Sequence, residues 1–279
     1  MKQYPSLPTV ADAPDDLLAG GHLWLQEYLD GAHLRFQLRE SGALRFGDRD
    51  RVFDPDDVPL PYRHAVRHVR ERLDRDALRS AVPDVEAVVF FAEAMHRHAV
   101  AYDWERTPSV LGFDVWSGTR GQFLPPDAVE KILRRLGLDP VNAFRKEVRA
   151  ADFHPDRYQI PDSNWYDGPA AGVVVRTKTG QRAKLLHPGY EPNPAVEPFD
   201  ASPAELARTL ATGDRIRAIA AGLAERGRPV TTDAVLDRTL EAIYREEHHR
   251  LFDDASDVGL RAFRSAVAAR TQELLADRE

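Results

Sequence analysis

The sequence changes character at about residue 200, and this change constrains the fold more than any other feature. Before it, short apolar runs typical of β-strands alternate with turns that contain glycine or proline. After it, the chain is rich in alanine and arginine, and its apolar residues recur at helical spacing. Strands followed by helices, rather than alternating with them, favour an α+β fold. We therefore predict an antiparallel-sheet domain over residues 1–199 and an all-helical domain over residues 200–279.

Within the first domain, the clearest elements are strands joined by glycine turns. Asp30-Gly31 and Ser41-Gly42 are both hairpin-type signals, and Lys178-Thr-Gly180 is a third. Two longer stretches carry apolar residues at helical spacing instead, Tyr62–Arg79 and Pro125–Leu136. The predicted strands are 22–27, 32–39, 43–47, 85–94, 110–116, 171–177 and 181–186, while 141–147 gives no clear pattern.

The second domain reads as four helices separated by breaks. The breaks are expected at Gly213, at Gly227-Arg-Pro229 and at Asp253-Asp254. The predicted helices are 203–211, 214–226, 232–250 and 258–277.

Composition excludes several classes of chemistry. The chain has no cysteine, so disulfides, thiolate metal sites and cysteine nucleophiles are ruled out. The net charge of −7 argues against nucleic-acid binding by bulk electrostatics, although a local basic groove stays compatible with it. No apolar run is long enough to span a membrane, and the N-terminal sequence lacks the apolar core of a signal peptide, which indicates a cytoplasmic protein.

Five short stretches of sequence are each too common to indicate a function alone, but their order along the chain is specific. They are Glu27-Tyr-Leu-Asp-Gly-Ala32, Phe91-Ala-Glu-Ala94, Leu111-Gly-Phe-Asp114, Ala170-Ala-Gly-Val-Val-Val-Arg176 and Arg182-Ala-Lys184. In this order the chain resembles the ATP-dependent RNA ligases of the RNA ligase 2 group, which are covalent nucleotidyltransferases, over about its first 190 residues. The resemblance implies an ATP-grasp-like ligase domain. DNA ligases and capping enzymes would instead lead us to expect a β-rich barrel after this domain, where this chain is helical.

The resemblance also implies roles for particular residues. The position of Tyr28 is that of the nucleophile, and Glu27, Asp30 and Gly31 complete the first motif around it. Glu93 corresponds to the glutamate that holds the ribose, and Phe113 to the ring that stacks on adenine. Arg182 and Lys184 would supply cations for the phosphates, as would Arg49 or Arg51, either of which matches an arginine beyond the nucleophile. Considered alone, each residue also has an ordinary structural role, in the core or on a solvated face.

Two departures from the family pattern bear on catalysis. Tyr28 replaces the lysine that would carry AMP; a phenol has a pKa near 10, as lysine does, but its oxygen sits on a rigid ring and would give a phosphodiester. Ala171 replaces a glutamate that would help to hold the divalent metal, and a methyl group cannot coordinate one. The chain therefore offers no metal ligand at this position, and self-adenylylation is expected to be absent or very slow. His33 in place of asparagine and Ala92 in place of glycine are milder changes.

Three histidine clusters carry less weight. His64 and His68 are four residues apart on a predicted helix but lack a carboxylate partner. His96-Arg-His98 has the composition of a metal or phosphate site, yet loop histidines beside arginine usually lie on the surface. Glu246-Glu-His-His249 lacks the order of residues found in zinc proteases, so we reject that interpretation.

Three functions follow from these observations. The first is an RNA ligase that uses ATP with Mg²⁺ or Mn²⁺, transfers AMP to a 5′-phosphate and joins it to a 3′-hydroxyl of RNA. The second is a catalytically inactive pseudo-ligase that binds nucleotide or RNA ends reversibly. The third is a helical partner-binding protein with a vestigial pocket. The resemblance favours the first, and the replaced residues favour the second.

Overall fold

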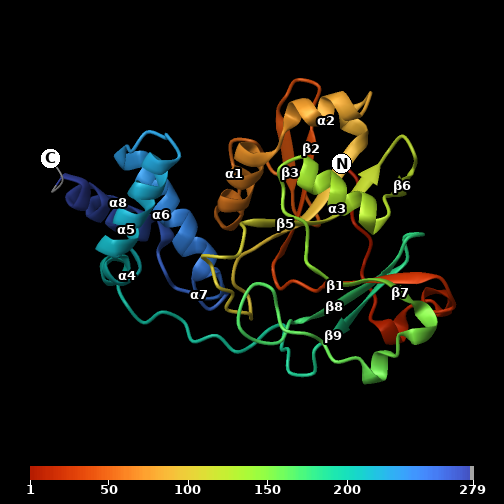
Figure 1. The fold of residues 1–279 in the computed structure, drawn as a ribbon. Coiled ribbons are helices and arrows are strands. Elements are labelled where there is room, and N and C mark those ends of the chain that lie inside the picture. The colour runs from red at the N-terminus through yellow and green to blue at the C-terminus, as the bar shows by residue number, and fades with distance from the viewer. Residues whose placement is uncertain (277–279) are drawn as a thin grey trace. The chain divides into compact units, whose positions relative to one another are not determined.

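The computed structural model describes residues 1–276, which divide into two compact units (Figure 1). The first unit comprises Met1–Met95 and Val100–Pro192, and the second comprises His96–Ala99 and the described residues from Asn193 onward. The sequence placed the boundary after residue 199, where composition changes, and gave no sign that 96–99 belongs with the helices. Composition changes only where helix α4 (Pro203–Leu210) begins, whereas residues 193–202, which lie in no helix or strand, already belong to the second unit.

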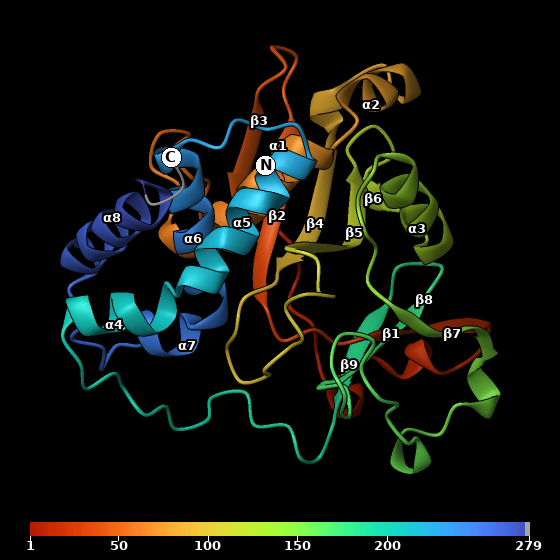
Figure 2. The ribbon, with the colours of Figure 1, turned by 60° about the vertical axis from the view of Figure 1, so that its left-hand side comes forward.

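Two antiparallel sheets form the first unit (Figure 2). The smaller sheet has the order β7 (Ala143–Arg149), β1 (His22–Glu27), β8 (Gly172–Thr177), β9 (Arg182–Leu186). The larger sheet has the order β3 (Leu44–Gly47), β2 (Ala32–Leu38), β4 (Val88–Ala94), β5 (Val110–Ser117), β6 (Gln122–Phe123). Strands β6 and β7 were not predicted, since β6 has two residues and β7 is mostly exposed without regular alternation.

The predicted hairpin at Asp30-Gly31 is wrong. Strand β1 pairs with β7 and β8, whereas β2 pairs with β3 and β4, so the two strands that flank this turn lie in different sheets. Gly31 is required here for close approach, because a Cβ atom would lie 2.9 Å from the carbonyl oxygen of Ala94. The turns at Ser41-Gly42 and Lys178-Thr-Gly180 do join paired strands, with φ of 87° at Gly42 and 103° at Gly180.

Helices cover one face of the larger sheet. The predicted helix over 62–79 is in fact two, α1 (Arg63–Arg72) and α2 (Arg75–Ala81), because Leu73 turns to an extended conformation and the side chain of Asp74 caps α2. The segment 85–94 likewise begins with a 3₁₀ turn before β4. These two helices and α3 (Pro126–Arg135) bury their apolar side chains against alternate residues of the strands, including Leu34, Phe36, Phe90, Ala92 and Val115.

The strand residues that alternate with these core residues point to the other face of each sheet, and several of them are polar. On β2 and β4, His33, Arg35 and Glu93 occupy the positions between the core residues. On β8, Val173 and Val175 face a separate core with Phe153, so Val174 and Arg176 point to the other side. The first unit therefore presents two strand faces that carry charged side chains, and the candidate site lies there.

Helices form the second unit. They are α4, α5 (Gly213–Glu225), α6 (Thr232–Glu246), α7 (His248–Leu251) and α8 (Leu260–Ala276). The predicted helix over 232–250 breaks at Glu247, and residue 277 of the last predicted helix lies outside the described residues. Ile216, Leu240, Ile243, Phe263 and Val267 are among the buried core residues. Across residues 1–276, none of the helices has the length and apolarity to cross a membrane.

Candidate functional site

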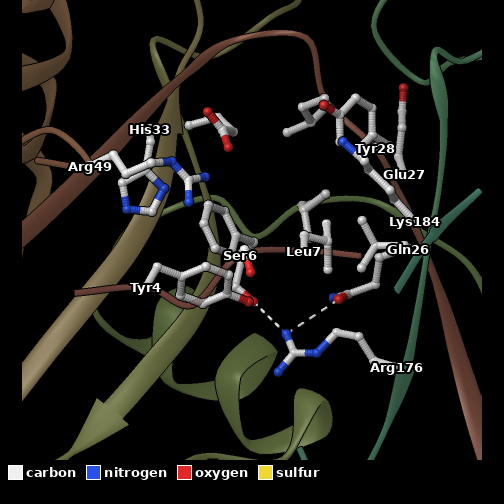
Figure 3. Close-up of a pocket in the computed structure, with 15 residues that line it drawn as sticks. Tyr4, Ser6, Leu7, Gln26, Glu27, Tyr28, His33, Arg49, Arg176 and Lys184 are labelled. Carbon is white, nitrogen blue, oxygen red and sulfur yellow. Dashed lines mark hydrogen bonds between the residues drawn. The ribbon is translucent and has the colours of Figure 1, made fainter. Parts of the chain in front are cut away.

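A cavity of about 300 Å³ opens between the polar faces of the two sheets (Figure 3). Strands β1, β8 and β9 line one side of it, and β2, β4 and β5 the other. Among the residues that the sequence singled out, the cavity brings together Glu27, Tyr28, Arg49, Glu93, Phe113 and Lys184. Asp30, Gly31 and Arg182 do not line it, and Arg51 does not either.

Tyr28 and Lys184 lie side by side at this cavity (Figure 3). Tyr28 follows the end of β1, where its backbone N–H donates to the carbonyl oxygen of Gly172 over 3.0 Å. The ammonium of Lys184 lies 5.7 Å from the centre of the Tyr28 ring. Burial raises the pKa of the Tyr28 phenol above 10, and the carboxylates of Glu93 and Asp30 raise it further while Arg49 opposes them. The phenol is therefore protonated at neutral pH, and its oxygen is a weak nucleophile.

Glu93 and Arg49 are ionisable groups that line the cavity and influence each other. Burial raises the pKa of the Glu93 carboxyl to about 8, Asp30 contributes in the same direction, and Arg49 lowers it. Among residues 1–276, no group donates a hydrogen bond to the buried Oε2 of Glu93. His33, beside Arg49 in Figure 3, has its pKa lowered to about 4 by burial and then by the positive charges of Arg49 and Arg35, so it is neutral at pH 7.

Glu27 lines the cavity but also holds a loop in place. Its Oε1 accepts a hydrogen bond from the Ser163 hydroxyl at 2.6 Å, and its Oε2 accepts from Asn142 and from the backbone of Asn164, both at 3.3 Å. These bonds oppose the effect of burial, which raises the pKa of its carboxyl. Because its carboxylate is already satisfied by the protein, Glu27 positions the chain around the cavity.

Asp30 has a similar positioning part outside the cavity. Its carboxylate accepts hydrogen bonds from the backbone of Val100 and from the Tyr190 hydroxyl, each at 2.7 Å. Its own backbone N–H donates to the Tyr102 hydroxyl at 2.8 Å. The Leu-Asp-Gly stretch between β1 and β2 is thus held in place by three residues that are distant in sequence, Val100, Tyr102 and Tyr190.

Arg182 is paired inside the protein. Asp114 of β5 accepts hydrogen bonds from Arg176 of β8 at 3.1 Å and from Arg182 of β9, so this carboxylate joins the two sheets. The side chains are 0%, 2% and 6% exposed in the order Asp114, Arg176, Arg182. Arg182 and Lys184 share a strand face, as i and i+2 require, but only Lys184 reaches the cavity.

The N-terminal segment forms a wall that the sequence did not reveal. The backbone N–H of Lys184 donates to the carbonyl oxygen of Pro8 over 2.8 Å, so this segment runs beside β9. Tyr4 packs its ring 5.1 Å from that of Phe113 and donates its hydroxyl to Asp114 over 2.9 Å. The additional lining residues are Tyr4, Ser6, Leu7, Gln26, Leu29, His33, Val141, Val174 and Arg176. No local pattern marks Tyr4, because Asp114 follows it by 110 residues.

The cavity offers few ligands for a divalent cation. Carboxylate oxygens are the ligands that Mg²⁺ prefers, often together with phosphates of a substrate. Glu27 is occupied by Ser163, Asn142 and Asn164, and Ala171 has only a buried methyl group. Within residues 1–276, the Oε2 atom of Glu93 is a carboxylate oxygen that accepts no hydrogen bond from the protein. The residues therefore fit an ion held by one carboxylate and by a bound nucleotide's phosphates.

Comparison with known proteins identifies the family. A sequence profile described as RNA ligase matches residues 21–186, which is more than half of the chain and contains the strands around the cavity. The chain belongs to the RNA ligase family. No curated protein matches this ligase-family chain in sequence.

Solved structures agree on the fold. An archaeal ATP-dependent RNA ligase superposes with a TM-score of 0.50 at 15% identity, over all of this chain and 65% of its own. Two mutants of the Naegleria gruberi RNA ligase, one with ATP and Mn and one with AMP and Mn, give TM-scores of 0.52 and 0.51 at 11% and 13% identity. Both comparisons cover 67% of this chain and 56% of the other. The predicted α+β nucleotidyltransferase fold is confirmed, and this ligase-family chain spans about 65% of the archaeal relative's length.

Proposed function

We propose that this chain binds ATP or AMP in the cavity between its sheets and RNA ends beside it, for 5′-phosphate/3′-hydroxyl joining, with its own adenylylation impaired. The observation that carries the proposal is the convergence of Tyr28, Arg49, Glu93, Phe113 and Lys184 on one cavity. Its volume of about 300 Å³ lies at the lower end of the range for small-ligand pockets.

Each lining group suits one part of a nucleotide. Phe113 and Val174 offer apolar surface to a base. The free oxygen of Glu93 accepts hydrogen bonds from hydroxyl groups such as those of ribose. Lys184 and Arg49 line the cavity and would attract phosphates, whereas Arg176 is paired with Asp114. Mg²⁺ or Mn²⁺ bound through the phosphates of the nucleotide would neutralise their charge.

The covalent step is the part of ligase chemistry that the chain lacks. Tyr28 occupies the position of the family lysine, and its protonated phenol is a weak nucleophile toward the α-phosphate. Ala171 adds no oxygen ligand for a metal. An RNA end that is already adenylylated needs only the second step, attack by a 3′-hydroxyl, and this step does not require the missing lysine.

The second candidate function is a pseudo-ligase that binds nucleotide or RNA ends without joining them. The same two replacements, at Tyr28 and Ala171, favour it. The two functions differ in one respect, which is whether a pre-adenylylated RNA end is joined.

One set of assays tests these proposals. α-Labelled ATP with Mg²⁺ or Mn²⁺ should leave no label on the wild-type chain in a denaturing gel, whereas the double variant Tyr28→Lys with Ala171→Glu should become labelled. AMP and ATP should raise the melting temperature of the wild type, and Arg49→Ala should reduce this shift more than the matched control Arg51→Ala, whose side chain is exposed outside the cavity.

The outcomes separate the candidates. Label on the wild-type protein would contradict the impairment, and the absence of any nucleotide-dependent stabilisation would contradict the binding site. Joining of pre-adenylylated RNA by the wild type supports the ligase, and failure of this reaction with intact nucleotide binding supports the pseudo-ligase.

A further inference from the structure

Three histidines gather in the second unit. His96 and His98 come from the short segment that belongs with the helices, and His248 is the first residue of α7. One ligand nitrogen from each lies within 4.8 Å of the other two. The ring centres are 4.0 Å apart for His96 and His248, 4.6 Å for His98 and His248, and 4.9 Å for His96 and His98.

The fold brings together two short histidine-containing stretches of the sequence, one around His96 and one around His248. The backbone N–H of Arg97 donates to the carbonyl oxygen of Arg245 over 2.9 Å, which fixes the segment against the last turn of α6. The helix then breaks at Glu247, and this break directs His248 toward the segment. Each sequence cluster supplies too few ligands for a metal, but the tertiary structure combines them into a set of three.

We propose that His96, His98 and His248 form a binding site for a divalent transition-metal ion of the zinc type. Imidazole nitrogen is a ligand for zinc, cobalt, nickel and copper, whereas Mg²⁺ and Ca²⁺ prefer oxygen. The site is therefore distinct in chemistry from the carboxylate-and-phosphate site inferred for the ligase cavity, and it goes beyond the proposed function.

Geometry supports a shared ion. In a tetrahedral site with metal–nitrogen bonds of about 2.05 Å, neighbouring nitrogens are about 3.3 Å apart. Closing from 4.8 Å to this spacing is within the reach of side-chain rotations. His96 and His248 stack at an angle of 19°, so both rings must tilt for their lone pairs to meet at one ion.

The environment of His248 favours the ligand form. Its Nδ1 is buried and accepts no hydrogen bond from residues 1–276. In a neutral imidazole one of the two ring nitrogens keeps a lone pair, and this lone pair is the group that binds a metal. The ring is also supported by Phe252, which stacks on it with the centres 5.3 Å apart.

Solvent reaches the cluster from one side. His98 borders a cavity of about 440 Å³ that is lined also by Glu247 and His249. Water from this cavity would complete a four-coordinate ion beside the three imidazoles. Because His98 and His248 come from distant parts of the chain, a bound ion would fasten the 96–99 segment to the helical unit and stabilise it.

Metal content and thermal stability test the proposal. The full chain, stripped with a chelator and dialysed against Zn²⁺, should retain one zinc per chain by mass spectrometry and should melt at a higher temperature than the stripped protein. His248→Gln should lose the zinc and the thermal shift. The matched control is His154→Gln, since His154 is exposed and lies outside the cluster.

Two further measurements keep the test decisive. If His248→Gln fails to fold, His98→Gln replaces it, because His98 is only partly buried. Cobalt substitution should give the visible absorption of a nitrogen-ligated tetrahedral ion in the wild type and not in these variants. Zinc retention equal in the wild type and in both cluster variants, or no stoichiometric zinc in the wild type, would overturn the proposal.

Discussion

The carboxylate of Asp114 is expected to be among the most important single groups for the stability of the first unit. It is fully buried and lies between two buried guanidinium groups, those of Arg176 and Arg182. It also accepts a hydrogen bond from the hydroxyl of Tyr4, and this bond holds the N-terminal segment against β5. Asp114→Asn keeps the size of the side chain but removes its negative charge. Among residues 1–276, Asp114 is the only carboxylate that forms an ion pair with either of these arginines.

The size of the effect follows from burial. Removing one partner of a buried ion pair typically destabilises a protein by about 3–5 kcal/mol, because the remaining charge is left uncompensated. Here two guanidinium groups lose their counter-charge, so we expect a loss of at least about 3 kcal/mol. With a urea dependence of about 2 kcal/mol per M, the midpoint of unfolding falls by roughly 1.5 M or more.

Tryptophan fluorescence during urea unfolding measures this loss in the right part of the molecule. All four tryptophans, Trp24, Trp104, Trp116 and Trp165, belong to the first unit, so their emission reports on that unit rather than on the helices. The matched control is Asp152→Ala. Its ion pair with Arg149 is at the surface, with side chains 52% and 71% exposed, and such pairs contribute about 0–1 kcal/mol.

A small effect would refute the reasoning. If Asp114→Asn and Asp152→Ala lowered the free energy of unfolding by similar amounts below about 1 kcal/mol, the buried charges would have to be compensated in another way. A second variant locates the cost. Adding Arg182→Met to Asp114→Asn removes one of the uncompensated charges, so it should recover part of the lost stability.

Further predictions concern the cavity and the connection between the sheets. Gly31→Ala places a methyl group 2.9 Å from the carbonyl oxygen of Ala94 and should lower the free energy of unfolding in a urea titration by about 1–3 kcal/mol. Gly20→Ala is the control and should have little effect in the same titration, because Gly20 has open space around it. Burial raises the pKa of Glu93 from 4.5 to about 8, so the folded state retains a proton that the unfolded state releases. This stabilisation is complete below pH 4.5 and disappears as the pH rises toward 8. The free energy of unfolding of the wild type should therefore fall more than that of Glu93→Gln between pH 4.5 and 8, and parallel pH profiles of the two proteins would contradict the raised pKa of Glu93. Lys184→Met should weaken AMP binding by about ten- to a hundredfold in calorimetry, as expected for a lost charge-assisted hydrogen bond, while Lys178→Met, whose ammonium pairs with Glu147, should bind as the wild type does.

Much of the local structure could be predicted because it depends on neighbouring residues. Apolar alternation located most strands, and the turn residues at Ser41-Gly42 and Lys178-Thr-Gly180 predicted two hairpins that the structure contains. The segment 62–79 was predicted as one helix but forms two, because Asp74 caps a new helix at a position that periodicity alone does not reveal. The roles assigned to Tyr28, Glu93, Phe113 and Lys184 stay predictions, although these residues lie around one cavity.

The sequence by itself determined most of the elements, the change from sheets to helices, and the order of motifs typical of the RNA ligase family. Apart from the two hairpins, only the tertiary structure decided which strands pair, and it separated β1 from β2 despite the turn signal at Asp30-Gly31. It also paired Arg182 with Asp114 away from the cavity and assembled His96, His98 and His248. The reason is physical: periodicity and turn propensity act over a few residues, whereas strand pairing, buried charges and ligand clusters depend on contacts between residues far apart in the chain.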